Sequence, residues 1–191
     1  IELSTGEKVT IVILDFNHDD LENGEKAGIT FGMKDLLSTK YPIHSTNVAV
    51  SYVDSNMYKS TLPTIYSMLP GDLKSKIKTV CKMNGTVNSV LQTISCQLFL
   101  FAKSEVSTTS GDGLGTRYPY YTMPATVDAQ ERLKRVGGAM GSVTSWWLRQ
   151  VETTVRDGQS GYYWGLVGLQ GSASGTSSIT NSMGVCFGFC I

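Results

Sequence analysis

The sequence predicts an α+β domain in which most strands pair antiparallel. Short runs rich in β-branched and aromatic residues are mixed with short stretches of helical periodicity. These stretches do not follow the strands with the regularity of βαβ units, which argues against a parallel sheet. No segment repeats with a period of about 20–50 residues. We therefore expect one domain that covers residues 1–191.

The expected strands share an apolar, β-branched or aromatic composition. The first two flank a polar turn at 18–24 and are expected to form a long hairpin. The last strand alternates, so Val185, Phe187, Phe189 and Ile191 should share one face. The complete set of expected strands is 9–16, 27–33, 78–83, 95–101, 145–149 and 184–191.

Short helices are expected where apolar residues recur at helical spacing. Asp54 is a suitable N-cap for a helix that follows it, and Pro63 suits the first turn of a second one. Further helical turns are expected near 69–77, 102–106 and 128–135. The remaining segments are predicted as irregular structure, loops or turns, and they are 38–51, 84–89, 107–115 and 137–142.

Composition argues against several classes of function. Hydrophobic residues make up 41% of the chain, charged residues only 17%, and the formal net charge is zero. Binding to nucleic acid or to anionic membranes requires a basic excess, so neither partner is expected. No segment is long and apolar enough to span a bilayer, since even the run 11–16 is short and contains Asp15, so no direct membrane insertion is predicted. No signal peptide is visible, although the first residue is not Met, which is compatible with prior removal of a targeting segment.

The cysteines do not form a recognisable metal or redox motif. None of the four belongs to a Cys-x-x-Cys pair. Cys186 and Cys190 lie in one expected strand, about 13 Å apart, whereas a disulfide needs Cα atoms within about 7 Å. We interpret Cys81, Cys96, Cys186 and Cys190 as small buried apolar residues.

Other candidate chemistry is equally weak. His18 with Asp15, Asp19 and Asp20 offers ligand types for a metal, but the spacing matches neither an EF-hand loop nor His-Glu-x-x-His. A solvated hairpin tip is the preferred interpretation. The glycine-rich run 110–115 does not match a P-loop, and no Gly-x-Ser-x-Gly elbow is present. We therefore predict no metal, no cofactor and no catalytic residue.

The last fifth of the chain has an unusual composition. No charged residue follows Asp157, and residues 158–183 combine clustered aromatic residues with Ser, Thr, Gly and Asn. Binding loops use this combination, because rigid rings supply contact area and small polar groups adapt their hydrogen bonds. A glycine-rich sheet edge with ordinary core aromatics is the alternative interpretation.

Motifs near both ends resemble one group of proteins. The chain carries Trp-Trp-Leu-Arg at 146–149, Phe-Gly-Phe-Cys at 187–190, and the N-terminal segments 13–20 and 27–34. Together they resemble the variable proteins of diversity-generating retroelements, in the branch of phage and bacterial proteins with a Trp-Trp-Leu-Arg motif. The middle of the chain matches only in the order of its elements. Gln150 and Val151 replace the Ser-Pro that commonly follows this motif in relatives.

The resemblance implies a C-type-lectin-like fold of the subtype shared with formylglycine-generating enzymes, in which N- and C-terminal strands pair. It implies a variable ligand-binding region at 150–183, whose side chains vary while the backbone is retained. The expected function is hypervariable receptor recognition or adhesion, without enzymatic activity. The expected partner is a protein or glycan on another cell or host surface. The expected location is extracellular, on a virion or on a cell surface, and an oligomer is compatible with this function.

The resemblance also assigns roles within the variable region. Trp164, Val167 and Gly171 match fixed core and turn positions. Mutagenesis of Asn codons at adenines yields neither Trp nor Gln nor Met, so the resemblance implies that Trp164, Gln170 and Met183 are scaffold residues or come from other codons. Trp146, Trp147, Phe187 and Phe189 are expected to anchor the core. The expected displayed positions are Tyr162, Tyr163, Gly165, Leu166, Gly168, Leu169, Ser172, Ser174, Thr176, Ser178, Thr180 and Ser182.

Two alternatives remain open. The first is a structural tip or connector module of a phage fibre or cell-surface protein, which would use the same surface to form an oligomer. The second is a cysteine-dependent enzyme like others on this fold, although Cys186 and Cys190 have no basic sequence neighbour that would lower a thiol pKa. Calcium-mediated sugar binding is disfavoured, because no carboxylate side chain follows Asp157.

Overall fold

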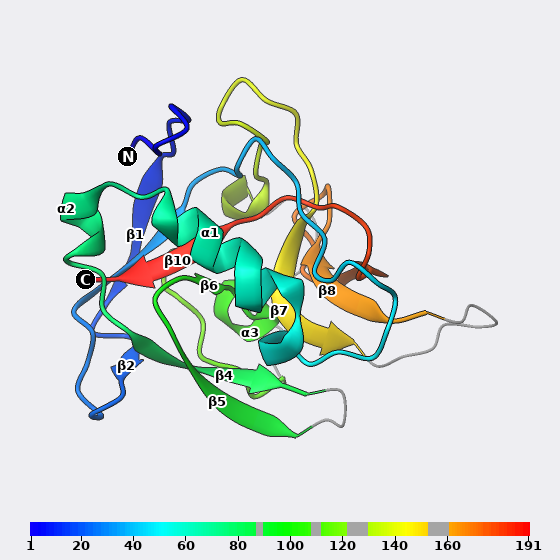
Figure 1. Cartoon of the computed structure of the whole chain (residues 1–191), viewed down its shortest axis with the longest axis horizontal. Coiled ribbons are helices and arrows are strands. Elements are labelled where there is room, and N and C mark those ends of the chain that lie inside the picture. The colour runs from blue at the N-terminus through cyan, green and yellow to red at the C-terminus, as the bar shows by residue number, and fades with distance from the viewer. Residues whose placement is uncertain (87–89, 108–111, 122–129, 153–160) are drawn as a thin grey trace.

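The computed structural model describes residues 1–86, 90–107, 112–121, 130–152 and 161–191. It confirms a mixed α+β architecture with three mostly antiparallel sheets and a few short helices. The N- and C-termini lie on the same side of the molecule, away from β8 (Figure 1).

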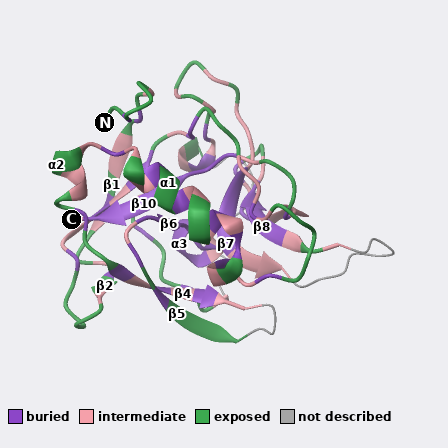
Figure 2. Cartoon of the chain, viewed as in Figure 1, coloured by how far each residue is buried: buried purple, intermediate pink, exposed green. Residues whose placement is uncertain are grey.

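The first sheet joins the two ends of the chain. Its strand order is β1 (Ile11–Phe16), β3 (Ile29–Met33), β10 (Phe187–Cys190) and β6 (Phe99–Leu100). β1 and β3 pair antiparallel, which confirms the expected hairpin, and β10 lies between β3 and β6. Every residue of β10 is buried (Figure 2). Its alternation therefore does not separate a core face from a solvent face, because both faces of this central strand are covered.

One glycine permits the close packing of this sheet. A Cβ atom at Gly188 would lie 2.5 Å from the Phe99 ring and 2.9 Å from the Phe101 ring. Both rings are fully buried and could not move aside without disturbing the core. The Phe-Gly-Phe-Cys ending thus places two aromatic side chains around a position where only hydrogen fits.

The second sheet has the order β2 (Asp20–Leu21), β4 (Val80–Gly85) and β5 (Leu91–Cys96). β4 confirms the strand expected at 78–83, although it continues into the predicted loop. The strand expected at 95–101 is split by a bend into β5 and β6, and β5 begins four residues earlier. Most of β5 is exposed (Figure 2), so it lacks the apolar alternation that would have predicted it.

The helices are short, as expected. The turn η1 (Tyr52–Asp54) precedes a π-helical segment, η2 (Met57–Thr61), which continues directly into α1 (Leu62–Ser67). Pro63 lies in the first turn of α1, as predicted. Asp54 is not an N-cap, because it belongs to η1 and pairs with Lys59 at 2.8 Å.

Three further helical elements follow: α2 (Gly71–Lys74), α3 (Lys103–Val106) and η3 (Gln130–Arg132). All three fall within segments predicted to contain a helix; residues 128 and 129 of the third prediction lie outside the described part of the chain. Among the described residues, no helix is long and apolar enough to cross a membrane.

The third sheet has the order β7 (Trp146–Glu152), β8 (Tyr163–Val167) and β9 (Gly175–Ser178), and β8 and β9 lie within the expected variable region 150–183. Trp146 and Trp147 are completely buried, as are Phe187 and Phe189 from the first sheet. These four aromatic residues therefore anchor the core, as expected from the sequence.

Candidate functional site

The candidate binding surface lies on the sheet that contains β7, and β7 has a bulge between Trp147 and Val151. Trp147 pairs with Leu166 and Val151 pairs with Trp164, so four steps along β7 oppose two along β8. Such a bulge bends the strand and re-aims its side chains. Consequently Trp146, Trp147, Leu148 and Arg149 are all fully buried, which a regular alternating strand with one exposed face would not allow.

Hydrogen bonds from two buried side chains, Trp164 and Arg132, connect β8 and the turn after it to the core. The Trp164 indole nitrogen donates to the Leu148 carbonyl at 2.7 Å, which ties β8 to the bulge. Gly171 adopts a positive φ of 74° in the turn that connects β8 to β9. The Arg132 Nε atom donates to the Gly171 carbonyl at 2.6 Å. Trp164, Val167 and Gly171 are buried, in agreement with their expected scaffold roles.

The exposed side chains form three groups around this support. At the turn between β8 and β9, Leu169 is 61% exposed. On the sheet, Tyr163 pairs with Ser178, and both lie on the face opposite the Trp164 side chain. At the far end, Tyr162 is 46% exposed, and its backbone N–H donates to the Asn47 side chain at 2.9 Å. The exposed or half-buried members of the predicted set are Tyr162, Tyr163, Gly168, Leu169, Ser172, Ser174, Thr176, Ser178, Thr180 and Ser182.

Two predicted positions are not on this surface. Gly165 is buried, and a Cβ atom there would lie 3.3 Å from the Gln150 Cβ atom and 3.4 Å from its carbonyl oxygen. Leu166 is also buried, and its side chain lies where a Cβ atom of Gly175 would be. Their expected display is therefore corrected: the β7 bulge covers Gly165, while Leu166 packs against β9. Residues 153–160 of the expected variable region lie outside the described part of the chain.

Some of the small polar residues form side-chain hydrogen bonds with one another. Ser172 and Ser174 share one at 2.7 Å, and Ser178 and Thr180 share one at 3.1 Å. Each hydroxyl retains further donor or acceptor capacity. The surface can thus offer aromatic and apolar contact area at Tyr162 and Leu169 together with adaptable hydroxyl groups.

Arg149 of β7 belongs to a buried ion cluster, which we define as Asp19, Lys82, Glu105, Tyr118 and Arg149. Arg149 uses its complete donor set, since all five N–H groups have an acceptor. Its Nη1 and Nη2 atoms donate to the two Glu105 carboxylate oxygens at 2.6 and 2.8 Å. The other donations go to the carbonyl oxygens of Met83, Leu100 and Leu114 at 2.8, 2.8 and 2.6 Å.

The second half of the cluster is centred on Lys82. Its ammonium group contacts the Asp19 carboxylate, donates to Glu105 at 2.9 Å, and donates to the Tyr118 hydroxyl at 2.5 Å. The Tyr118 hydroxyl lies 3.1 and 3.0 Å from the two Asp19 oxygens. Lys82 Nζ also lies 4.1 Å from the centroid of the Phe99 ring. Two cations and two carboxylates are therefore paired inside an aromatic enclosure.

Pairing outweighs burial in setting the pKa values of the cluster. Burial alone would raise the pKa of Asp19 and Glu105. The Lys82 charge nevertheless holds the pKa of Asp19 below its ordinary value, and the Arg149 and Lys82 charges do the same for Glu105. Burial alone would lower the pKa of Lys82, but Glu105 and Asp19 raise it. All four side chains are therefore ionised at neutral pH in this arrangement.

The prediction of a solvated hairpin tip holds for exposed Asp20 but is wrong for Asp19, which belongs to this cluster. Asp19 is 5% exposed and also accepts a hydrogen bond from Thr30 at 2.6 Å. His18 pairs with Asp15 at 2.7 Å and packs on the Tyr118 ring at 4.3 Å between centroids. The tip folds inward because it supplies the carboxylate that compensates Lys82, a partner distant in sequence that local spacing does not reveal.

Three of the four cysteines are buried, and Cys81 is half-buried. All four are free. Burial raises the pKa of Cys96 to about 12, and burial together with the Asp19 carboxylate raises that of Cys190 to about 12. Burial also raises the pKa of Cys186. Thiols in such surroundings are protonated at neutral pH and are poor nucleophiles.

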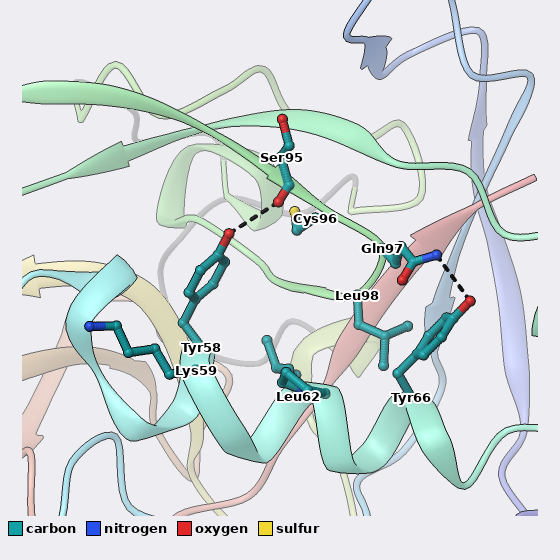
Figure 3. Close-up of a pocket in the computed structure, with 9 residues that line it drawn as sticks. Tyr58, Lys59, Leu62, Tyr66, Ser95, Cys96, Gln97 and Leu98 are labelled. Atoms are coloured by element: carbon teal, nitrogen blue, oxygen red, sulfur yellow. Dashed lines mark hydrogen bonds between the residues drawn. The ribbon is translucent and has the colours of Figure 1, made fainter.

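A separate groove lies between η2–α1 and the end of β5, with a volume of about 360 Å³ (Figure 3). Tyr58 and Tyr66 project from the helical side towards the strand side (Figure 3). The Tyr58 hydroxyl donates to the Ser95 carbonyl at 3.0 Å, and Gln97 donates to the Tyr66 hydroxyl at 3.0 Å. Both tyrosine hydroxyls are thus engaged within the protein, which leaves mainly ring and aliphatic surface along this groove.

Within the described residues, no group of three or more His, Cys, Asp or Glu side chains is arranged to hold a metal ion. The chain matches no protein-family model, no curated protein and no solved structure in the comparisons made with each of these.

Proposed function

We propose that this protein is a non-enzymatic, hypervariable ligand-binding protein that displays diversified side chains on a C-type-lectin-like scaffold. The carrying observation is the separation within β8 and β9 between buried supports and exposed small or aromatic residues. Trp164 is held by the Leu148 carbonyl, whereas Tyr162 and Leu169 project into solvent. Substitution of exposed residues usually changes stability by only about 0.5 kcal/mol, so such a surface tolerates variation.

The proposed ligand is a protein or glycan on another cell or host surface, met outside the cell that makes this protein. Aromatic residues such as Tyr162 tend to dominate binding energy, and the neighbouring hydroxyl groups suit adaptable hydrogen bonding. No charged residue follows Asp157 in the sequence. Shape and hydrogen bonding, rather than long-range electrostatic attraction, would then govern recognition.

Sequencing of the flanking DNA tests this proposal. We expect a reverse-transcriptase gene and a near-copy of the segment that encodes residues 146–191. Differences between the copies should occur at adenines and should fall in codons of exposed residues such as Tyr162 and Leu169. The codons of Trp164 and Gly165 serve as internal controls and should be unchanged. Absence of both the enzyme gene and the near-copy would contradict the proposal.

The exposure of Tyr162 and Leu169 also supports a second candidate, a structural module that uses this surface as an oligomer interface. Light scattering distinguishes the two functions. A stable oligomer that dissociates on a combined Tyr162→Ser and Leu169→Ser change would favour the structural module. A monomer in both forms would favour display of the surface to a ligand.

A further inference from the structure

The contact between Lys82 and Asp19 has the components of a reaction centre. The Lys82 Nζ atom touches the Asp19 carboxylate directly, and a Glu105 oxygen lies 2.9 Å from the same nitrogen. Tyr118 places its hydroxyl within 3.1 Å of both Asp19 oxygens. A nucleophile, an electrophilic carbon, a proton acceptor and a hydrogen-bond donor are thus held together by four separate segments of the chain.

The surroundings hold the reacting groups in contact and exclude water from them. The Lys82, Asp19 and Glu105 side chains are only 3%, 5% and 2% exposed. Exclusion of water removes the excess of the leaving molecule that opposes amide formation in solution. Fixed contact between reacting groups corresponds to effective concentrations of about 10⁵–10⁸ M. The aromatic rings of Phe99 and Tyr118 lie against the Lys82 nitrogen and complete the enclosure.

We propose that Lys82 and Asp19 condense spontaneously into an intramolecular amide bond, with Glu105 as the proton carrier. The Lys82 ammonium gives one proton to Glu105, and the resulting amine attacks the Asp19 Cγ atom. A C–N bond forms, and one C–O bond of the carboxylate breaks. The departing oxygen receives one proton from Glu105 and a second proton from the attacking nitrogen, and it leaves as water. An ammonium and a carboxylate become an amide and water, without an oxidant, reductant or activating co-reactant.

Two further contacts suit this reaction. The Tyr118 hydroxyl can donate to whichever Asp19 oxygen carries negative charge in the tetrahedral intermediate. The reaction removes one positive and one negative charge together, so the paired Glu105 and Arg149 remain balanced in the product. This accounts for the second ion pair beside the first: it keeps Glu105 compensated before and after condensation.

The amide would cross-link the tip between β1 and β2 to strand β4. Because Asp19 and Lys82 are 63 positions apart, the bond would close a long loop and restrict the unfolded chain. Such a bond would also resist reduction, unlike a disulfide. A covalent brace of this kind suits a protein exposed to mechanical load or proteases, but the proposed reaction does not depend on the proposed ligand-binding function.

Intact mass spectrometry of the folded, full-length chain tests the amide directly. The expected mass is lower than that of the sequence by one water molecule, including after denaturation. Trypsin should then yield residues 9–26 joined to residues 79–103, because an acylated Lys82 is not cleaved. Lys82→Arg should restore the full sequence mass, while the matched control Lys78→Arg should keep the loss of water. Folded wild-type protein that retains the full sequence mass after prolonged incubation would overturn the proposal, as would a water loss located at another pair of residues.

Glu105→Gln tests the role of the proton carrier. If this variant folds, we expect the loss of water to be at least tenfold slower than in the wild type. A loss at the wild-type rate would overturn the assignment to Glu105. If the variant does not fold, the mass of the wild type and of Lys82→Arg still decides whether the bond exists.

Discussion

Replacement of Arg149 by lysine isolates the contribution of guanidinium geometry, because the positive charge is retained. Arg149 makes five donations, to Glu105 and to three backbone carbonyls, at 2.6–2.8 Å. Lysine has only three donors on one atom, so at least two of these hydrogen bonds are lost. A hydrogen bond to a charged group contributes about 1.5–3 kcal/mol, which gives about 3–6 kcal/mol for Arg149→Lys. This is a large part of the roughly 5–15 kcal/mol by which a domain is stable.

Urea unfolding monitored by tryptophan fluorescence measures this loss. The expected result is a lower midpoint with an unchanged slope, because the change in exposed surface is the same. The same substitution at exposed Arg135, which donates to the Gly141 carbonyl at 2.8 Å, is the matched control. It should change stability by no more than about 0.5 kcal/mol. A loss of less than about 1 kcal/mol for Arg149→Lys would show that the five guanidinium hydrogen bonds do not stabilise the fold.

Three further perturbations follow from buried groups. The pKa of Glu105 in the folded protein lies below its ordinary value of 4.5, so ionised Glu105 stabilises the fold fully above pH 4.5 and this stabilisation is lost as the pH falls below that value. The urea midpoint, measured at decreasing pH, should therefore fall in this range, and a rise would contradict the pairing of Glu105. A chromogenic disulfide reagent should modify one thiol per folded chain rapidly, at half-buried Cys81, and the other three only on unfolding; rapid modification of all four would contradict the burial of Cys96, Cys186 and Cys190. Gly188→Ala should cost about 1–3 kcal/mol in the same unfolding assay, because its Cβ atom would overlap the Phe99 ring, whereas Gly71→Ala, with open space at its Cβ position, should be nearly neutral.

Elements with strong local patterns could be predicted from the sequence. The β1–β3 hairpin, β7 and β10 could be predicted because each is rich in apolar, β-branched or aromatic residues, and β4 could be located from its shorter apolar stretch at Val80 and Cys81. β5 was missed at its start because Leu91, Gln92 and Thr93 lie on an exposed edge and show no apolar alternation. The bulge in β7 was also missed, since it depends on the pairing with β8 and on the core position of Arg149 rather than on local composition.

The candidate surface was predictable in part, for a similar reason. Composition located Tyr162 and Leu169, which are exposed, but it could not distinguish them from Gly165 and Leu166, which are buried. All four lie within eight residues, and only the packing of β7 and β9 on β8 separates them. The ion cluster was not predicted at all, because Asp19 and Lys82 are 63 positions apart and each is ordinary in its local sequence.

The same packing limits which positions a diversified repertoire could use. Gly175 lies against the Leu166 side chain, where an added Cβ atom would be 2.5 Å from the Leu166 Cδ1 atom. A change at either residue therefore needs a compensating change at the other, which independent mutation rarely supplies. Tyr162 and Leu169 have no such constraint, because their side chains project from opposite ends of β8 into solvent. Variation without loss of folding is thus confined to the ends and outer face of the sheet, while Arg149 and the aromatic core hold its inner face.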